Sequence, residues 1–168
     1  MKPGATSAVK VHDLVARGFQ IVGWREKLAL PDIGVGLIRA KVDTGALTSA
    51  LHVDDLKFFD RNGRRWVRFH PPGPNGRPAP EHASARMREF REVRSSSGQV
   101  ERRCVIATRF VIGREIFRAE VTLTDRTDMV YNMLVGRSAM RIGRLIVDPT
   151  RSWMAGNPVG PEQMDADH

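Results

Sequence analysis

Short apolar runs separated by turn residues recur along most of the chain and predict an all-β fold. They cover residues 21–30, 35–42, 48–59 and 65–69, and then residues 100–112, 115–124 and 130–135. Alternation is clearest from Phe117 to Thr124, where Phe, Ala, Val and Leu fall on one face of a strand. Many short strands joined by tight turns are typical of a sandwich or a barrel.

Turn residues divide these runs. Asn62-Gly63 and Gly113-Arg114 each predict the turn of a hairpin. Five prolines between Pro71 and Pro80 remove five backbone donors, so a central strand is excluded there. Residues 71–85 are therefore expected to form an inserted surface loop.

One short helix is expected at residues 137–142, directly after Gly136. Residues 1–19 and 154–168 are polar or rich in Gly and Pro, and we expect both to form tails. The first residues lack the apolar segment of a secretory signal, and no run approaches the roughly 18 apolar residues of a membrane span. A cytoplasmic setting with no membrane partner is the expectation.

Composition adds a strong positive charge. Lys and Arg total 27 against 19 Asp and Glu, which gives a formal charge of +8. Arginine accounts for 22 of the basic residues, and 11 of these lie in residues 61–103. Because guanidinium groups bind carboxylates and phosphates through paired hydrogen bonds, acidic partners are expected. Part of this charge is expected to be a solvated strand face, since alternation turns charged residues outward.

The cysteine and the aromatic residues bear on disulfide bonding, the core and the choice of acidic partner. Cys104 is the only cysteine, so no intramolecular disulfide can form, and its apolar neighbours predict a buried strand. The three tryptophans, Trp24, Trp66 and Trp153, are expected in the core. Aromatic residues make up 7% of the chain and no recognition helix is visible, so nucleic acid is the disfavoured acidic partner despite a pI near 10.7.

The candidate chemistry begins where a predicted strand ends in Asp43-Thr44-Gly45-Ala46. Asp-Thr-Gly is typical of aspartic peptidases, in which two such loops face each other and their two carboxyl groups share a proton. One carboxyl acts as the general base on a water and the other as the general acid. A plain β-turn at a strand end is the alternative interpretation of the tripeptide. The apolar run 132–135, closed by Gly136-Arg137, favours the peptidase.

These two motifs resemble the retropepsin-like aspartic peptidases, and in particular the bacterial RimB-type family, often labelled "ATP-dependent zinc protease". The motifs that carry the resemblance are Val22–Glu26, Lys41–Ala46, Thr48–His52, Arg64–Val67, Val93–Gly98, Val147–Pro149 and Met133–Arg137. The resemblance covers about residues 20–153. It implies a retropepsin-like closed β-barrel with one short C-terminal helix, and an endopeptidase without a cofactor.

The resemblance also implies roles for individual residues. Asp43 would be catalytic, with Thr44 bracing the loop and Gly45 leaving its amide free to bind the carboxylate. One Asp-Thr-Gly per chain implies a homodimer. The run ending in Gly136-Arg137 would lie behind the catalytic loop as a structural support. RimB-type proteins are associated with ligases that add glutamate tails to proteins, which implies a glutamate-rich substrate and a partner in a glutamate-ligase pathway.

Substrate contacts are expected beside the catalytic loop and in a flap hairpin. The residues are Ala46, Leu47, Arg94, Ser95, Ser96, Ser97, Gly98, Arg102 and Arg103. Position 47 is usually Arg in the family, so Leu47 is expected to alter substrate selectivity and not the class of chemistry. Two arms of alternating residues around the small residues 95–98 predict the hairpin itself, and an ordinary surface hairpin is the alternative interpretation. On the arginine-rich arms, only alternate side chains can face a cleft.

Two other functions stay open. The five histidines show no His-Glu-x-x-His spacing, and no Gly-rich loop ending in Gly-Lys-Ser/Thr is present, so neither word of the label "ATP-dependent zinc" finds support in the residues. A zinc-dependent hydrolase using His52, Asp54 and His70 remains an alternative. A non-catalytic basic module that binds an acidic protein or nucleic acid is the other.

Overall fold

The computed structural model describes residues 8–95, 97–125 and 129–160 of the 168-residue chain. The elements are α1 (Val11–Ala16), β1 (Gln20–Leu30), the 3-10 helix η1 (Pro31–Ile33), β2 (Val35–Val42), β3 (Ser49–His52), β4 (Asp54–Arg61), β5 (Arg64–His70), β6 (Ala83–Arg86), β7 (Glu89–Arg94), β8 (Val100–Ile112), β9 (Glu115–Thr124), β10 (Met133–Val135), α2 (Arg137–Gly143) and β11 (Leu145–Ser152). The all-β prediction is confirmed. No helix among these residues is long and apolar enough to cross a membrane.

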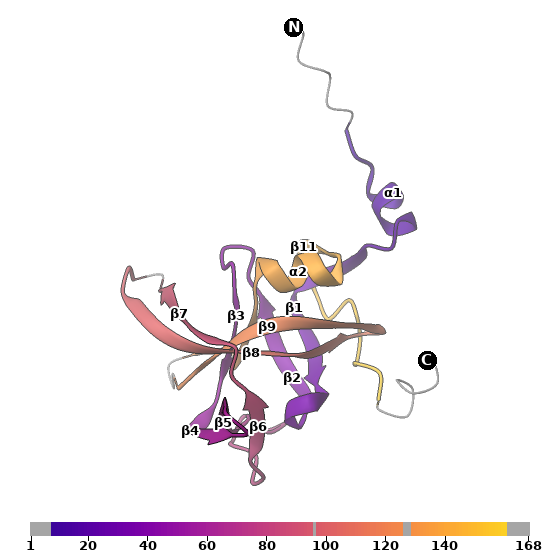
Figure 1. Ribbon diagram of the computed structural model, residues 1–168. Coiled ribbons are helices and arrows are strands. Elements are labelled where there is room, and N and C mark those ends of the chain that lie inside the picture. The colour runs from indigo at the N-terminus through magenta and orange to yellow at the C-terminus, as the bar shows by residue number, and fades with distance from the viewer. Residues whose placement is uncertain (1–7, 96, 126–128, 161–168) are drawn as a thin grey trace, which may run out of the picture.

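The main sheet closes on itself. Its strand order is β11-β1-β2-β10-β3-β9-β8-β7, and β1 also pairs with β8, so six of the strands form a ring. Strands β11 and β7 branch from the ring at β1 and β8, and β4, β5 and β6 form a second, three-stranded sheet (Figure 1). The apolar core fills the interior of this arrangement.

Alternating hydrophobicity located the long strands well. Three predicted runs coincide with β2, β8 and β9; burial alternates along most of β2, and β8 and β9 contain longer buried stretches. The predicted run 48–59 is wrong as a single strand, since the chain leaves the ring after β3 and starts the second sheet at β4. The predicted insert 71–85 is a loop only up to residue 82, because β6 begins at Ala83 and pairs with β5.

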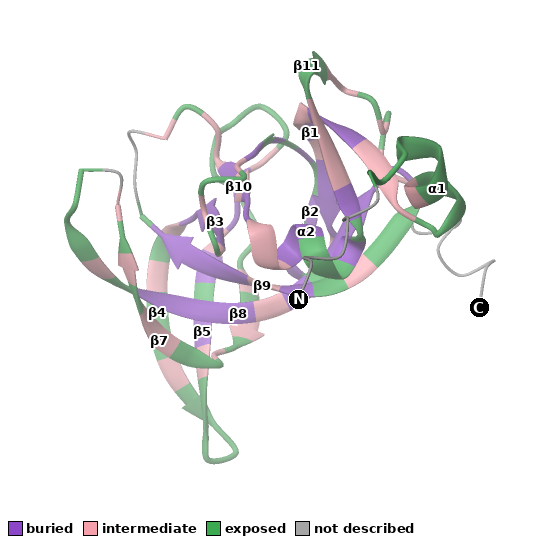
Figure 2. Cartoon of the chain, turned by 90° about the horizontal axis from the view of Figure 1, so that it is seen from above, coloured by how far each residue is buried: buried purple, intermediate pink, exposed green. Residues whose placement is uncertain are grey.

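Both predicted turns form. Asn62 and Gly63 adopt φ values of 51° and 73° between β4 and β5, as a tight hairpin requires, and Gly113 (φ 58°) follows β8. The predicted C-terminal helix is confirmed as α2. The structure adds α1, an exposed helix within the predicted N-terminal tail (Figure 2).

Cys104 is 2% exposed, so the prediction that it is buried is confirmed. The prediction that the three tryptophans lie in the core is wrong. Burial also raises the pKa of the Cys104 thiol to about 11. Trp24, Trp66 and Trp153 are all half-buried and lie outside the apolar core. Each ring carries an arginine guanidinium over its face, at 4.3–5.0 Å from the ring centre, which explains why the rings remain at the surface.

A buried carboxylate fixes the segment after β11. Glu26 is fully buried on β1 and accepts hydrogen bonds from the amides of Gly23 (2.8 Å), Met154 (2.7 Å) and Ala155 (3.2 Å). Farther along, the amide of Val159 donates to the Gly113 carbonyl (2.9 Å). Residues 154–159 are thus held against the fold, contrary to the expectation of a tail from residue 154.

Candidate active site

The strand order places Asp43 beside the segment predicted to support it. Strand β10 lies between β2 and β3, parallel to β2 and antiparallel to β3. Parallel β2 and β10 end at the same edge, so Asp43, just after β2, lies next to Gly136, just after β10. The Asp43 amide donates to the Val135 carbonyl (2.8 Å), which continues the pairing into the loop.

The Asp43 loop orients its own carboxylate. The Gly45 amide donates to Oδ1 of Asp43 (2.9 Å), and the Ala46 amide donates to the Asp43 carbonyl (3.3 Å). A Cβ atom at position 45 would lie 3.2 Å from the same Oδ1, a tight contact. Asp43 is half-buried, while Thr44 and Gly45 are exposed. One carboxylate oxygen is therefore positioned by the backbone at an accessible turn.

Arg137 and its neighbour support this loop from α2. The Arg137 guanidinium donates to the Thr44 carbonyl (2.9 Å), and its amide donates to the Ala46 carbonyl (2.8 Å). The Ser138 amide donates to the carbonyl of Leu47 (2.9 Å), whose side chain is 54% exposed. Three donors at the start of α2 thus hydrogen-bond to the carbonyl groups of Thr44, Ala46 and Leu47.

Ser49 and Gly136 make a close contact that sequence reasoning missed. The buried Ser49 hydroxyl accepts a hydrogen bond from the Gly136 amide (2.9 Å). A Cβ atom on Gly136 would lie 2.6 Å from the carbonyl carbon of Thr48, so only glycine fits here. The two residues are 87 positions apart, and the only signal was that both lie within the family motifs.

The proposed flap forms as a hairpin. β7 pairs with β8 from Glu89↔Val105 to Arg94↔Val100, and the Gly98 amide donates to the Ser95 carbonyl (2.9 Å) across the tip. The hairpin extends away from the rest of the sheet, at the left of Figure 1. Ser97 is exposed, and Ser96 lies outside the described residues. No hydrogen bond between described residues joins the tip to the Asp43 loop, so closure over a substrate stays a prediction.

The arginines of this hairpin differ in what surrounds them. Arg103 is 8% exposed and forms an ion pair with Glu101 (2.9 Å), so its charge is already paired. Arg102 points to the opposite face, is exposed, and stacks on Phe90 (4.2 Å). Arg94 is exposed near the tip. Arg94 and Arg102 remain the candidates for substrate contact on this hairpin.

Several other arginines are paired with carboxylates. Arg91 contacts Glu120 (2.7 Å), and Arg109 donates two hydrogen bonds to Asp32 (2.6 and 2.8 Å). The Arg109 guanidinium holds the pKa of Asp32 below its ordinary value. This pairing confirms that part of the positive charge is a solvated, structural surface.

Metal-ligating side chains gather at the opposite end of β3. His52, Asp54 and Asp125 offer ligand atoms within 4.8 Å of one another, whereas His70 contacts the His82 ring and the Ala79 carbonyl instead. The expected set of His52, Asp54 and His70 is therefore corrected. β3 starts at Ser49 by the Asp43 loop and ends at His52, so about 10 Å of strand separates the cluster from that loop. A cation held there would not reach Asp43.

Comparison with known proteins identifies the family and two curated relatives. The family model described as RimB-like, retropepsin-like aspartic endopeptidase RimB, matches residues 21–158. Two curated relatives are named probable alpha-L-glutamate ligase. The one from Shewanella halifaxensis is 39% identical over 147 residues, which cover 86% of this chain and 32% of that protein. The one from Parasynechococcus marenigrum is 41% identical, with coverage of 87% and 31%. The chain thus spans about a third of the length of these relatives.

The fold also matches a solved structure. A crystal structure of a Legionella pneumophila protein of unknown function superposes with a TM-score of 0.68 at 26% identity. The match covers 80% of this chain and 97% of that one.

Proposed function

The chain belongs to the family of RimB-like, retropepsin-like aspartic endopeptidases, and on this premise we propose that it hydrolyses peptide bonds with Asp43 as a homodimer. The observation that carries the proposal is the Asp43 loop, in which a backbone amide orients one carboxylate oxygen and α2 fixes the loop from behind. This is the arrangement that a carboxyl group needs in order to activate a water in a fixed direction.

The mechanism requires a second carboxyl group. In a pair of facing Asp43 loops the two carboxyl groups share one proton, because two such close negative charges cannot both ionise. The ionised carboxylate removes a proton from a water that attacks the peptide carbonyl, while the protonated one donates to the carbonyl oxygen. Collapse of the tetrahedral intermediate then releases the amine, which takes a proton.

Two-fold symmetry supplies the second loop. The chain contains one Asp-Thr-Gly and no Asp-Ser-Gly, and an isologous dimer brings Asp43 of one protomer against Asp43 of its partner. The exposed Thr44, Gly45 and Leu47 offer a surface for that contact. The alternative is a monomeric module of the same fold without activity.

The proposed substrate is an acidic, glutamate-rich peptide or protein tail. The charge of +8 favours acidic partners. The curated relatives, named probable alpha-L-glutamate ligase, carry the matching region within longer chains, which supports a partner that adds glutamate. Arg94 and Arg102 are the proposed contacts on the hairpin.

Peptide cleavage by the purified protein tests the proposal. Asp43→Asn is expected to lower kcat by at least about 1000-fold with an unchanged thermal unfolding temperature, since the amide keeps the Gly45 hydrogen bond and cannot share a proton. Asp60→Asn, a change at an exposed carboxylate of β4, is the matched control and should retain activity. A chelator should have no effect. Full loss with chelator and rescue by zinc would instead favour a hydrolase built on the His52, Asp54 and Asp125 cluster.

A further inference from the structure

Four cations occupy the outer face of the β1–β2 hairpin. They form two directly opposed pairs, Arg25↔Lys41 and Lys27↔Arg39. Like charges directly opposite each other destabilise a sheet. Within the described residues, none of the four has a carboxylate within salt-bridge distance. We call these four residues the basic strip. Its unbalanced charge contrasts with Arg91, Arg103 and Arg109, each of which contacts a carboxylate.

An aromatic residue in a strained conformation organises the basic strip. Trp153 has a φ of 61°, a conformation that a bulky side chain rarely adopts, and its amide donates to the Arg25 carbonyl (2.9 Å). Its ring lies 5.0–5.8 Å from the charged groups of Arg25, Lys27 and Arg39. The ring therefore gathers three cations that would otherwise repel one another and separate.

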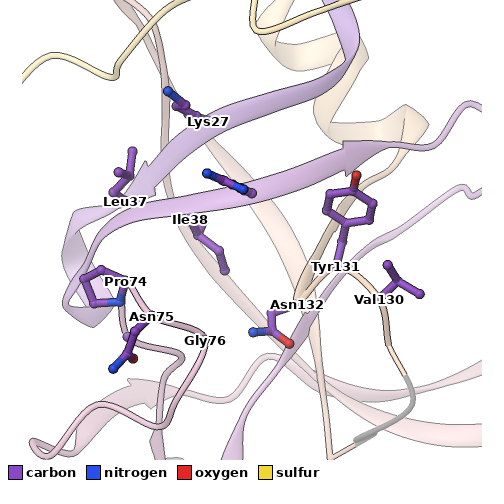
Figure 3. Close-up of a pocket in the computed structure, with 11 residues that line it drawn as sticks. Lys27, Leu37, Ile38, Pro74, Asn75, Gly76, Val130, Tyr131 and Asn132 are labelled. Atoms are coloured by element: carbon purple, nitrogen blue, oxygen red, sulfur yellow. The ribbon is translucent and has the colours of Figure 1, made fainter.

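A pocket of about 600 Å³ adjoins the basic strip. Lys27 and Arg39 line one side, and polar side chains from two loops, Asn75 and Asn132, line others. Figure 3 shows Ile38 at the centre, with Pro74–Gly76 and Val130–Asn132 on either side. A cavity of this size, with two cations and two amides around an apolar floor, suits a short acidic side chain and the backbone next to it.

The basic strip lies on the same face of β2 as the Asp43 side chain. Along β2 the even positions Ile38, Ala40 and Val42 are buried, and the odd positions 39 and 41 are exposed. Asp43 continues the odd series. At about 3.3 Å per residue, Lys41 is about 7 Å and Arg39 about 13 Å from Asp43 along the strand.

We propose that the basic strip is a docking subsite for carboxylate side chains of the peptide cleaved at Asp43. This inference rests on the proposed function and adds where the acidic residues bind. An extended peptide has about the same rise per residue as β2, so the recognised carboxylates lie roughly two to four residues from the scissile bond. The subsite begins at the catalytic turn and ends in the pocket, which favours a peptide over a nucleic acid.

Peptide binding to a catalytically inactive protein tests the subsite without turnover. In the Asp43→Asn background, the variant Lys27→Gln/Arg39→Gln is compared with Lys57→Gln/Arg68→Gln. The second pair is likewise cationic and directly opposed, but it lies exposed on the second sheet, so its replacement removes the same charge from another place. The probes are a fluorescent glutamate-rich peptide, its glutamine counterpart and a single-stranded oligonucleotide of equal charge, measured by anisotropy at about 50 and about 200 mM salt.

The strip variant is expected to bind the glutamate peptide about tenfold more weakly at the lower salt, from the loss of two partly exposed ion pairs. The control should stay within about twofold, and glutamine-peptide binding should not change. Equal losses in both variants, or no loss in the strip variant, would overturn the proposal. So would tighter strip-dependent binding of the oligonucleotide. Strip-dependent peptide binding without cleavage by the wild-type protein would support the subsite and refute the proposed hydrolysis.

Discussion

Replacing Gly136 by alanine tests whether the contact behind the catalytic loop is as close as described. The added Cβ would lie 2.6 Å from the carbonyl carbon of Thr48 and 2.9 Å from the amide nitrogen of Ser49. Comfortable carbon contacts are about 3.5–4.0 Å, and the opposing atoms are backbone, which cannot rotate away. The β10–α2 corner must therefore move away from the loop by about 1 Å.

The expected cost follows from that displacement. Overpacking typically costs about 1–3 kcal/mol, and weakening the buried Gly136–Ser49 hydrogen bond (2.9 Å) costs about 1 kcal/mol more. A loss of about 2–4 kcal/mol lowers the unfolding temperature by roughly 5–15 °C in a chain of this size. Activity should fall as well, because the Arg137 donors would move relative to the Asp43 loop.

Thermal unfolding and peptide cleavage, both at fixed protein concentration, measure these two effects. Gly36→Ala is the matched control, since Gly36 lies on β2, has no positive φ, and its added Cβ meets nothing within 4 Å. That variant should unfold within about 2 °C of the wild-type protein. A Gly136→Ala protein with wild-type unfolding temperature and activity would refute the described contact.

Other changes test other parts of the molecule. Glu26→Ala leaves three backbone amides without their acceptor and should lower the free energy of unfolding in urea by about 3 kcal/mol; a loss below about 1 kcal/mol would contradict its structural role. Arg137→Lys keeps the backbone hydrogen bond but loses the planar donor to Thr44, so kcat should fall about tenfold or more with little change in stability. The pKa of Cys104 is raised to about 11 in the folded protein, so the thiol should resist alkylation at pH 8 until the protein unfolds. Because the folded pKa is the higher one, the stability that Cys104 confers is complete below about pH 9 and is lost as the pH rises through about 11; Cys104→Ala should remove that part of the alkaline destabilisation.

The sequence predicted the long strands that carry many buried apolar residues. Burial alternates along most of β2, while β8 and β9 contain runs of consecutive buried residues, and both patterns are visible as short apolar runs in the sequence. β6 and β11 could not be found in this way, because β6 has no fully buried residue and β11 has one. Their pairing with β5 and β1 is set by register, which is a property of two segments together.

In the candidate site, too, local motifs were predictable and contacts between distant segments were not. Asp43 and Arg137 stood out through motifs, and the structure brings their segments together. The Ser49–Gly136 contact joins residues 87 positions apart and has no local pattern. Alternation alone could place Arg39 on an outer face, but only the β1–β2 register puts Lys27 opposite it. The tryptophans were misplaced because hydrophobicity does not indicate that a ring will pair with an arginine.

The central claim is that one active site needs Asp43 from two chains, and mixed dimers test it most directly. Wild-type and Asp43→Asn proteins are denatured together, refolded at varying ratios, and assayed for cleavage of a glutamate-rich peptide. If both carboxyl groups are required, activity follows the square of the wild-type fraction, so an equal mixture retains about a quarter of the wild-type activity. An equal mixture that retains about half, with activity linear in the wild-type fraction, would show that each chain works alone and would contradict the shared Asp43 pair.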